Sequence, residues 1–306
     1  MALDEATTGF LTQMAAAGGK ALHEMTPEEA RGLGGMLGDL YGSGPEMARV
    51  ENTTADGVPV RILVPEGDVR GIFVYYHGGG WVIGAPDEFD TLGRTIAQRT
   101  GCTVVLVDYR LAPEHRFPAA ADDSWTALRW IDAHKADLGN PDAPLIVGGD
   151  SAGGNLSAVV ALKARDAGGP AIALQVLVYP VTDSDVDNAS YTDPANQLML
   201  SRESMIWFWD HYAPDPADRR HPDASPTRAA DLSNLPPAVV ITAEHDVLRQ
   251  EGEEYADKLK AAGNDVRFQR IDGQMHGFFT MINVLPGHGE ALDIVVEAVE
   301  KAVSNA

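Results

Sequence analysis

The stretch Leu145-Ile-Val-Gly-Gly-Asp-Ser-Ala-Gly-Gly-Asn-Leu-Ser-Ala158 joins an apolar strand to a helix of small residues through a sharp turn. Its centre, Gly149-Asp150-Ser151-Ala152-Gly153, matches the pattern Gly-x-Ser-x-Gly. A serine on such a turn takes a strained backbone conformation, so its neighbours must be nearly without side chains. The pattern therefore predicts Ser151 as a nucleophile at the start of a helix, whose free N–H groups favour a developing oxyanion.

Around this stretch, apolar strands alternate with amphipathic helical segments from residue 58 onward. Continuous β-branched runs that alternate with helices indicate an α/β fold, with a mostly parallel sheet covered on both faces. The predicted strands are Val58–Val64, Gly71–Tyr76, Thr103–Asp108, Leu145–Gly148, Ile172–Tyr179, Ala238–Ala243 and Val266–Ile271. The predicted helices are Glu88–Thr100, Ala119–Ala136, Ala152–Ala167, Glu251–Ala262 and Glu290–Val303.

Two segments break this rhythm. The first 50 residues contain a helix start at Thr26-Pro27-Glu28-Glu29, flanked by glycine-rich stretches that indicate short, mobile helices. Residues 181–235 contain no clear strand, many Asp and Pro, and one helical pattern at about Ser201–Tyr212. Such an excursion between two strands is best explained as an insertion over one edge of the sheet.

A second motif, His-Gly-Gly-Gly-Trp at residues 77–81, directly follows a predicted strand. Consecutive glycines let backbone N–H groups turn inward with nothing to block a substrate. We expect the N–H groups of Gly79, Gly80 and Ala152 to form an oxyanion hole. A phosphate loop is excluded because no Lys-Ser/Thr follows the glycines. His77 precedes the nucleophile in the chain, so we expect it to have an orienting or structural role.

A nucleophilic serine needs a base, and the base needs a carboxylate that holds its tautomer. Asp246 and His276 each follow a later predicted strand, at positions from which both side chains can reach Ser151. The favoured set is therefore Ser151, His276 and Asp246. The rival acids are Glu244 and Glu251, and the rival bases are His245 and His288.

These motifs, together with Asp108-Tyr-Arg-Leu-Ala-Pro-Glu-His115, Asp246-x-Leu-x-x-Glu-Gly252 and His276-Gly-Phe278, resemble those of the hormone-sensitive-lipase-like esterases. This is the bacterial family IV of the α/β-hydrolase fold, and Asp150 points to its GDSAG subgroup. The resemblance implies a carboxylesterase that cleaves short- to medium-chain acyl esters without a cofactor. It also implies a helical cap, here residues 1–45 and the insertion 181–225, over a catalytic domain formed by residues 46–180 and 226–306.

Aromatic residues of the cap and of the glycine motif are candidates for substrate contacts. One helical face carries Met205, Phe208, Trp209 and Tyr212. We expect this face to pack the cap onto the body, and a subset of it is a candidate lining of the acyl pocket. Trp81 is a candidate for either the pocket wall or the core. The candidate substrate-binding set is Trp81, Asp150, Phe208, Trp209 and Tyr212.

The charge of the chain restricts its partners. It has 306 residues, with 45 Asp and Glu against 23 Lys and Arg, and a net charge of -22. Such a chain repels phosphate backbones and anionic membranes, so we expect no nucleic acid or membrane partner but a small neutral ester. The acids are spread through the chain with no cluster at the motifs, as in a solvated coat, and an Asp-rich, Lys-poor coat also favours tolerance of high salt.

Cysteine and metal-ligand patterns exclude further chemistry. Cys102 is the only cysteine, so we expect a buried, inert thiol and neither a disulfide nor a Cys-based zinc site. The acidic residues Asp183, Asp185, Asp187 and Asp193 lack the spacing of a calcium loop, so no metal is predicted.

Location and assembly follow from weaker signals. The N-terminus lacks the features of a signal peptide and no apolar run is long enough to span a bilayer, so the predicted location is cytoplasmic. The alternating strand Val266–Ile271 is a candidate sheet edge that would pair two subunits into a homodimer.

Other functions stay open at this stage. An acyltransferase or an amide hydrolase would use the same residues with a different acceptor or bond. A ligand-binding homologue without catalysis would require the loss of a member of the serine, histidine and aspartate set, and all three are present.

Overall fold

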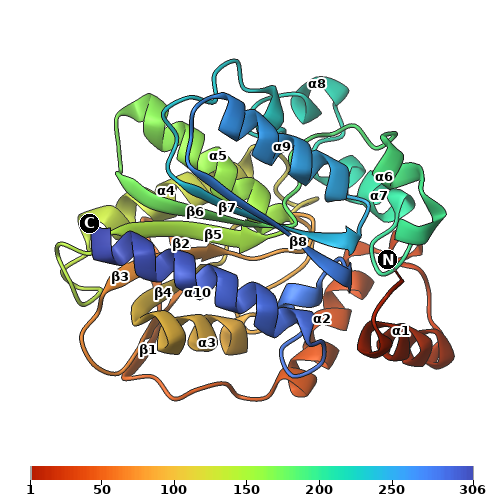
Figure 1. The fold of residues 1–306 in the computed structure, drawn as a ribbon, viewed down its shortest axis with the longest axis horizontal. Helices are drawn as coiled ribbons and strands as arrows, with labels where there is room; N and C mark the ends of the chain where they lie inside the picture. Colours follow the sequence, from red (N-terminus) through yellow and green to blue (C-terminus); the bar gives the residue numbers. More distant parts are fainter. Residues whose placement is uncertain (1, 306) are drawn as a thin grey trace.

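An eight-stranded sheet forms the centre of the computed structural model, which describes residues 2–305 without the side chains of residues 35–39 (Figure 1). The strand order is β1-β2-β4-β3-β5-β6-β7-β8. β2 is antiparallel to both of its neighbours and the remaining pairs are parallel, which confirms the predicted sheet. The strands are β1 Arg49–Ala55, β2 Val58–Val64, β3 Gly71–Tyr76, β4 Cys102–Val107, β5 Leu145–Asp150, β6 Ile172–Val178, β7 Ala238–His245 and β8 Val266–Met275.

Helices cover both faces of this sheet, with α4, α5 and α9 on one face and α3 and α10 on the other (Figure 1). The strands β3, β4 and β5 are consequently buried along their whole length, as expected for a parallel sheet between two helical layers. Among residues 2–305, no helix has the length and apolar character needed to cross a membrane. The bounds are α3 Asp90–Thr100, α4 Ala119–Ala133, α5 Ala152–Ala167, α9 Arg249–Ala261 and α10 Gly287–Asn305.

A third group of helices gathers at the end of the sheet toward which the arrows of β7 and β8 point (Figure 1). It includes the N-terminal helices α1 and α2 together with α6 and α7 of the inserted segment. The α-helices of these two segments are α1 Glu5–Ala17, α2 Pro27–Tyr41, α6 Ala189–Thr192, α7 Arg202–Tyr212 and α8 Pro216–Arg219. Short 3-10 turns occur at η1 Leu22–Glu24, η2 Pro194–Asn196, η3 Pro226–Arg228 and η4 Phe278–Thr280.

The N-terminal helices are longer than predicted. Thr26 caps α2 as predicted, because its hydroxyl accepts the Glu29 N–H, but α2 then runs for 15 residues and α1 for 13. The prediction of short helices there was wrong. A Cβ on Gly34 would lie 1.9 Å from the carboxylate at the end of the flexible Glu88 side chain, which would have to move aside.

The strand β1 was not predicted. Its side chains are mostly exposed, so it lacks the alternation of apolar and polar residues that identifies a half-buried strand. It forms a hairpin with β2 through Asp56 and Gly57, both with positive φ, and it makes one edge of the sheet. The strand β8 forms the opposite edge, as the sequence predicted for Val266–Ile271.

The cysteine lies where the sequence predicted it. Cys102 is fully buried at the start of β4, and burial raises the pKa of its thiol to about 11. Because the thiolate is the reactive form, this thiol is inert near neutral pH, which confirms the prediction.

Candidate active site

The turn at Ser151 has the strained geometry that its sequence predicted. Ser151 joins β5 to α5 with φ 56° and ψ -118°. A Cβ on Gly149 would lie 2.1 Å from the Tyr76 carbonyl oxygen, and a Cβ on Gly153 would lie 1.8 Å from the same atom. Both glycines are therefore required by the close approach of β3, which is the physical basis of the motif in this chain.

The structure brings Ser151, His276 and Asp246 into one hydrogen-bonded row. The His276 Nε2 lies 3.0 Å from the Ser151 Oγ, and its Nδ1 lies 2.8 Å from the Asp246 Oδ2. The second carboxylate oxygen of Asp246 accepts the Leu248 N–H at 2.9 Å. Asp246 is fully buried, whereas the His276 side chain keeps 13% of its surface exposed. The histidine thus faces the serine and solvent, with the carboxylate behind it.

The rival acids accept backbone N–H groups elsewhere. The Glu244 Oε2 accepts the Gly273 N–H at 2.8 Å, and the Glu251 Oε1 accepts the Thr182 N–H at 2.7 Å. The bond from Glu244 joins the end of β7, which carries Asp246, to the segment that leads to His276. The sequence did not reveal this bracing role, because no spacing signal distinguishes it from that of a catalytic acid.

The rival bases also have other neighbours. The Nδ1 of His288 donates to the Phe279 carbonyl at 2.5 Å, and the ring is buried. The Nε2 of His245 lies 3.8 Å from the Glu244 Oε2. Of the three histidines considered as the base, His276 is the one that the structure places against Ser151.

The glycine motif forms a loop, the glycine loop, whose backbone is held by the side chain of His77. Gly79, Gly80 and Trp81 all have positive φ, at 106°, 57° and 60°. The Nδ1 of His77 donates to the Gly78 carbonyl at 2.7 Å, and the ring stacks on Tyr109 with centroids 4.3 Å apart. Burial lowers the pKa of His77 to about 4, so this ring is neutral near pH 7. Its placement agrees with the orienting role expected for it.

Asp150 lies beneath the same loop. Its Oδ1 accepts both the Tyr75 hydroxyl at 2.7 Å and the Gly78 N–H at 2.9 Å. The side chain is 5% exposed, and burial raises the pKa of the carboxyl to about 6. These contacts hold the loop, while the predicted contact of Asp150 with substrate stays a prediction.

The aromatic face of α7 packs directly on the glycine loop. Trp81 stacks on Tyr212 with centroids 4.2 Å apart and touches Trp209 at 4.8 Å, and all three side chains are fully buried. A Cβ on Gly80 would lie 2.2 Å from the Phe208 ring, so Phe208 covers this glycine closely. Packing accounts for Trp81, Trp209 and Tyr212, and a contact of any of them with substrate stays a prediction.

Residues that the sequence did not single out border His276. The Tyr179 ring packs on the imidazole with centroids 4.5 Å apart, and its backbone has φ 32°. A Cβ on Gly277 would be in ordinary contact with the methyl groups of Met199 and Met281. The one signal for Tyr179 in the sequence was its position as the last residue of the predicted strand Ile172–Tyr179.

The acidic loop of the insertion is paired with arginines. The Arg228 Nη2 lies 2.6 Å from the Asp183 Oδ1, and Arg202 forms a close ion pair with Asp187. In the part of the chain that the structure describes, no group of three or more His, Cys, Asp and Glu side chains is arranged to hold a metal ion.

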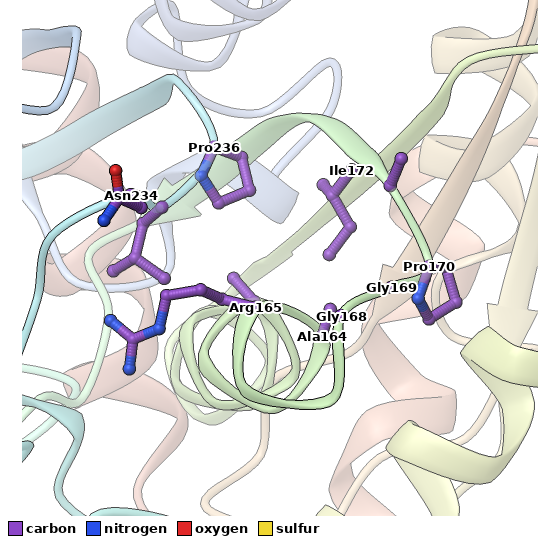
Figure 2. Close-up of a pocket in the computed structure, with 11 residues that line it drawn as sticks. Ala164, Arg165, Gly168, Gly169, Pro170, Ile172, Asn234 and Pro236 are labelled. Atoms are coloured by element: carbon purple, nitrogen blue, oxygen red, sulfur yellow. The ribbon is translucent and has the colours of Figure 1, made fainter.

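A cavity of about 350 Å³ lies far from Ser151 in the fold, between the C-terminal end of α5 and the segments that precede β6 and β7 (Figure 2). Its lining includes Arg165, Pro170, Ile172 and Asn234, and no lining residue is a histidine, cysteine or carboxylate. The Arg165 Nη1 already donates to the carbonyls of Asp231 and Ser233. The cavity therefore lacks the groups for nucleophilic chemistry, and the candidate site is the one at Ser151.

Comparisons with known proteins agree with this site. Residues 73–280 match a family described by the alpha/beta hydrolase fold. The carboxylesterase NlhH of Mycobacterium tuberculosis is 42% identical over 268 residues, which cover 85% of this chain and 84% of that protein. The ethyl acetate hydrolase of Pseudomonas putida is 38% identical over 258 residues, which cover 81% and 80%. A solved structure of the hyperthermophilic esterase of Pyrobaculum calidifontis superposes with a TM-score of 0.90 at 37% identity, over 98% of this chain and 99% of that one. The chain belongs to this α/β-hydrolase family and, within it, to the hormone-sensitive-lipase-like esterases.

Proposed function

We propose that the protein hydrolyses small, neutral carboxylic esters of short- to medium-chain acids, with Ser151 as nucleophile, His276 as base and Asp246 as the acid that orients it. The observation that carries this proposal is the row of hydrogen bonds from Ser151 through His276 to the buried Asp246. The relatives named above as esterases and ester hydrolases support the same reaction class.

The first step follows from this row. Nε2 of His276 takes the hydroxyl proton of Ser151 as Oγ attacks the ester carbonyl carbon. Asp246 accepts the Nδ1–H, which selects the tautomer with a free Nε2 and stabilises the imidazolium that forms. Because the Leu248 N–H holds the second oxygen of Asp246, the carboxylate cannot turn away from the imidazole.

The negative charge that develops on the carbonyl oxygen is stabilised by backbone donors. Ala152 opens α5, and the first turn of a helix has N–H groups without partners in that helix. The N–H groups of Gly79 and Gly80 complete the oxyanion hole from the opposite loop. Removing one such donor typically costs about 10² to 10³ in rate.

The second half of the reaction restores the enzyme. The imidazolium of His276 gives its proton to the leaving alcohol as the C–O bond breaks, and an acyl group remains on Ser151. A water molecule then loses its proton to His276 and attacks the acyl carbon. Collapse of the second tetrahedral intermediate releases the acid and returns the proton to Ser151.

The substrate size follows from the segments that surround the serine. We propose that residues 1–45 and 181–225 form a cap over the catalytic domain of residues 46–180 and 226–306. Phe208 of this cap covers Gly80, and Met199 of the same segment approaches Gly277, next to His276. Methionine side chains adapt to varied apolar groups, which suits acyl chains of differing short to medium length.

The preference for neutral esters follows from the charge of the chain. A net charge of -22 sets up a field that disfavours anionic substrates, more strongly at low salt. The cytoplasmic location predicted from the sequence stays a proposal.

The decisive experiment is hydrolysis of p-nitrophenyl butyrate by the wild type, by Ser151→Ala and by Ser304→Ala. Ser304 lies exposed on α10, so its variant controls for the loss of a hydroxyl group. We expect Ser304→Ala to match the wild type and Ser151→Ala to lose measurable turnover. Equal rates for Ser151→Ala and wild type would show that the nucleophile assignment is wrong.

The same assay, run over a panel of substrates, defines the reaction class. Butyrate esters should be cleaved faster than palmitate esters, and esters faster than amides of the same acid. Transfer to an added alcohol in preference to water would instead identify an acyltransferase.

A further inference from the structure

A series of hydrogen bonds between peptide units of the glycine loop ends at the peptide that carries the Gly80 N–H. A peptide plane carries its C=O and its N–H on opposite sides, so a bond that holds one group fixes the direction of the other. The Gly79 carbonyl accepts the N–H of Val82 at 3.1 Å and that of Ile83 at 2.9 Å. These two bonds hold the peptide between Gly79 and Gly80, and its N–H therefore points away from them.

Arg31 holds the next peptide in this series. Its Nε donates to the Val82 carbonyl at 2.9 Å, and that carbonyl belongs to the peptide that supplies the Ile83 N–H. A sequence of bonds thus leads from the guanidinium to the Val82 carbonyl, from the Ile83 N–H to the Gly79 carbonyl, and so to the Gly80 N–H.

A second branch reaches the same carbonyl. The Ala112 N–H donates to the Trp81 carbonyl at 2.8 Å, which belongs to the peptide that supplies the Val82 N–H. The Arg31 Nη2 donates to the Ala112 carbonyl at 2.9 Å. The Ala112 carbonyl belongs to the peptide after the one that supplies the Ala112 N–H, so this second branch holds the residue Ala112 rather than one continuous series of peptide planes.

Glu114 fixes the guanidinium itself. Its two carboxylate oxygens accept the Nη1 and Nη2 of Arg31 at 2.9 and 2.7 Å, in a bidentate pair. This pair draws the pKa of Glu114 down to about 2. Both groups are therefore charged near neutral pH. By contrast, the pair of Lys20 with Glu29, on the same N-terminal segment, touches no part of the loop.

We propose that Arg31 is a positioning residue for the oxyanion hole, holding the Gly80 N–H through the intervening Val82–Ile83 peptide unit. This inference rests on the proposed ester hydrolysis and on Gly80 as an oxyanion donor. Hydrogen bonds in a chain polarise one another, and a bond from a charged donor is stronger than a neutral one. The guanidinium therefore both fixes the direction of the Gly80 N–H and strengthens it as a donor.

A residue that positions an oxyanion donor affects kcat more than KM, whereas a residue that only stabilises the fold does not. The Gly80 N–H pairs with full negative charge only in the transition state, so weakening it lowers kcat and leaves KM nearly unchanged. Because Arg31 positions one of three donors without being one, we expect Arg31→Gln to lower kcat about tenfold, less than the loss of a donor. Affinity for a trifluoromethyl ketone, which forms a tetrahedral adduct on serine, should fall by a similar factor.

The experiment compares wild type, Arg31→Gln, Arg31→Lys and the matched control Lys20→Ala, each with butyrate ester kinetics, ketone inhibition and a thermal melt. We expect Lys20→Ala to match the wild type. Arg31→Lys keeps the charge but not the planar fork, so its kcat should lie between those of Arg31→Gln and the wild type.

Two results would overturn the proposal: an unchanged kcat in folded Arg31→Gln, or a loss confined to KM or melting temperature. If Arg31→Gln does not fold, Arg31→Lys decides by the same criteria, because it keeps the charge but loses the planar fork that reaches both the Val82 and the Ala112 carbonyls. If the wild type hydrolyses no ester, or Ser151→Ala is as active as the wild type, the proposed function itself fails, which separates the two outcomes.

Discussion

Replacing Asp150 by Asn should remove a pH-dependent loss of stability that the wild type suffers as pH rises. An Asn side chain has the shape of a protonated carboxyl, and its Oδ1 can keep both bonds that hold the site, from the Tyr75 hydroxyl and the Gly78 N–H. The variant therefore stands for the wild type with Asp150 permanently protonated. The free energies of unfolding of the two proteins should converge at low pH and diverge at neutral pH.

The size of the divergence follows from the pKa of this buried carboxyl, which rises from 3.8 to about 6 on folding because burial penalises its charge. A raised pKa means that the folded state binds the proton more tightly. The stability this adds is fully present below pH 3.8 and is lost as pH rises through about 6. At 1.36 kcal/mol per pKa unit the total loss is about 3 kcal/mol, of which about 2 kcal/mol falls between about pH 4.5 and about pH 7.5.

Urea unfolding of the two proteins at those two pH values measures this difference. We expect Asp150→Asn to gain about 2 kcal/mol relative to wild type between the lower and the higher pH. Asp257→Asn is the matched control, because it removes the same charge from a side chain on α9 that is 82% exposed. A difference between Asp150→Asn and wild type that stays constant with pH would refute the burial argument.

Further perturbations probe the turn, the cap, the surface and the assembly. Gly153→Ala should destabilise the protein by more than about 4 kcal/mol, because its Cβ would meet the backbone of Tyr76; a urea midpoint like that of the wild type would contradict this. Phe208→Ala should raise the ratio of octanoate to butyrate ester hydrolysis about tenfold by opening space over Gly80, and an unchanged ratio would place the acyl chain elsewhere. The melting temperature should rise from low to molar NaCl, as salt screens repulsion within a chain of net charge -22, and a falling melting temperature would rule out salt adaptation. We also propose that the edge strand β8 pairs two copies into a homodimer; light scattering should then give twice the monomer mass, and a monomer mass would end the proposal.

The turn at Ser151 was predictable because steric rules act on nearest neighbours in the sequence. Positions 149 and 153 must be glycine because β3 passes so close to the turn. This requirement is visible in the sequence as the Gly-x-Ser-x-Gly motif. The positions of Asp246 and His276 followed from a rule of topology, since the carboxyl ends of parallel strands meet at one end of the sheet.

The strand β1 and the N-terminal helices show where such rules fail. Exposure on both faces of β1 removed the apolar alternation, and the remaining signal was the pair Asp56-Gly57, which is typical of a two-residue hairpin turn. In α2, glycines that lower intrinsic helix propensity are tolerated because tertiary contacts offset the loss. The contact of Gly34 with Glu88 joins residues more than fifty positions apart, so local sequence holds no trace of it.

The polar side chains around Ser151, whose bonding partners the sequence could not predict, share one physical task. The proposed catalytic groups lie on segments that have left the sheet, where backbone N–H and C=O groups have lost their ladder partners. A buried backbone N–H or C=O without a hydrogen-bond partner costs free energy. A polar side chain must therefore supply the hydrogen bond that a neighbouring strand would otherwise make. Five side chains do this here: His77 on the Gly78 carbonyl, Asp150 on the Gly78 N–H, Glu244 on the Gly273 N–H, Glu251 on the Thr182 N–H and Asn155 on the carbonyls of Val181 and Ala224.

This task explains why the carboxylates near the site were hard to tell apart. Asp246 accepts a backbone N–H, as Glu244, Glu251 and Asp150 do, and it differs in that its second oxygen faces an imidazole. A catalytic acid is thus a backbone-bracing acid with one oxygen left for the base. Spacing along the chain does not encode that difference, because it depends on which loop the next strand brings alongside, and only the folded geometry decides it.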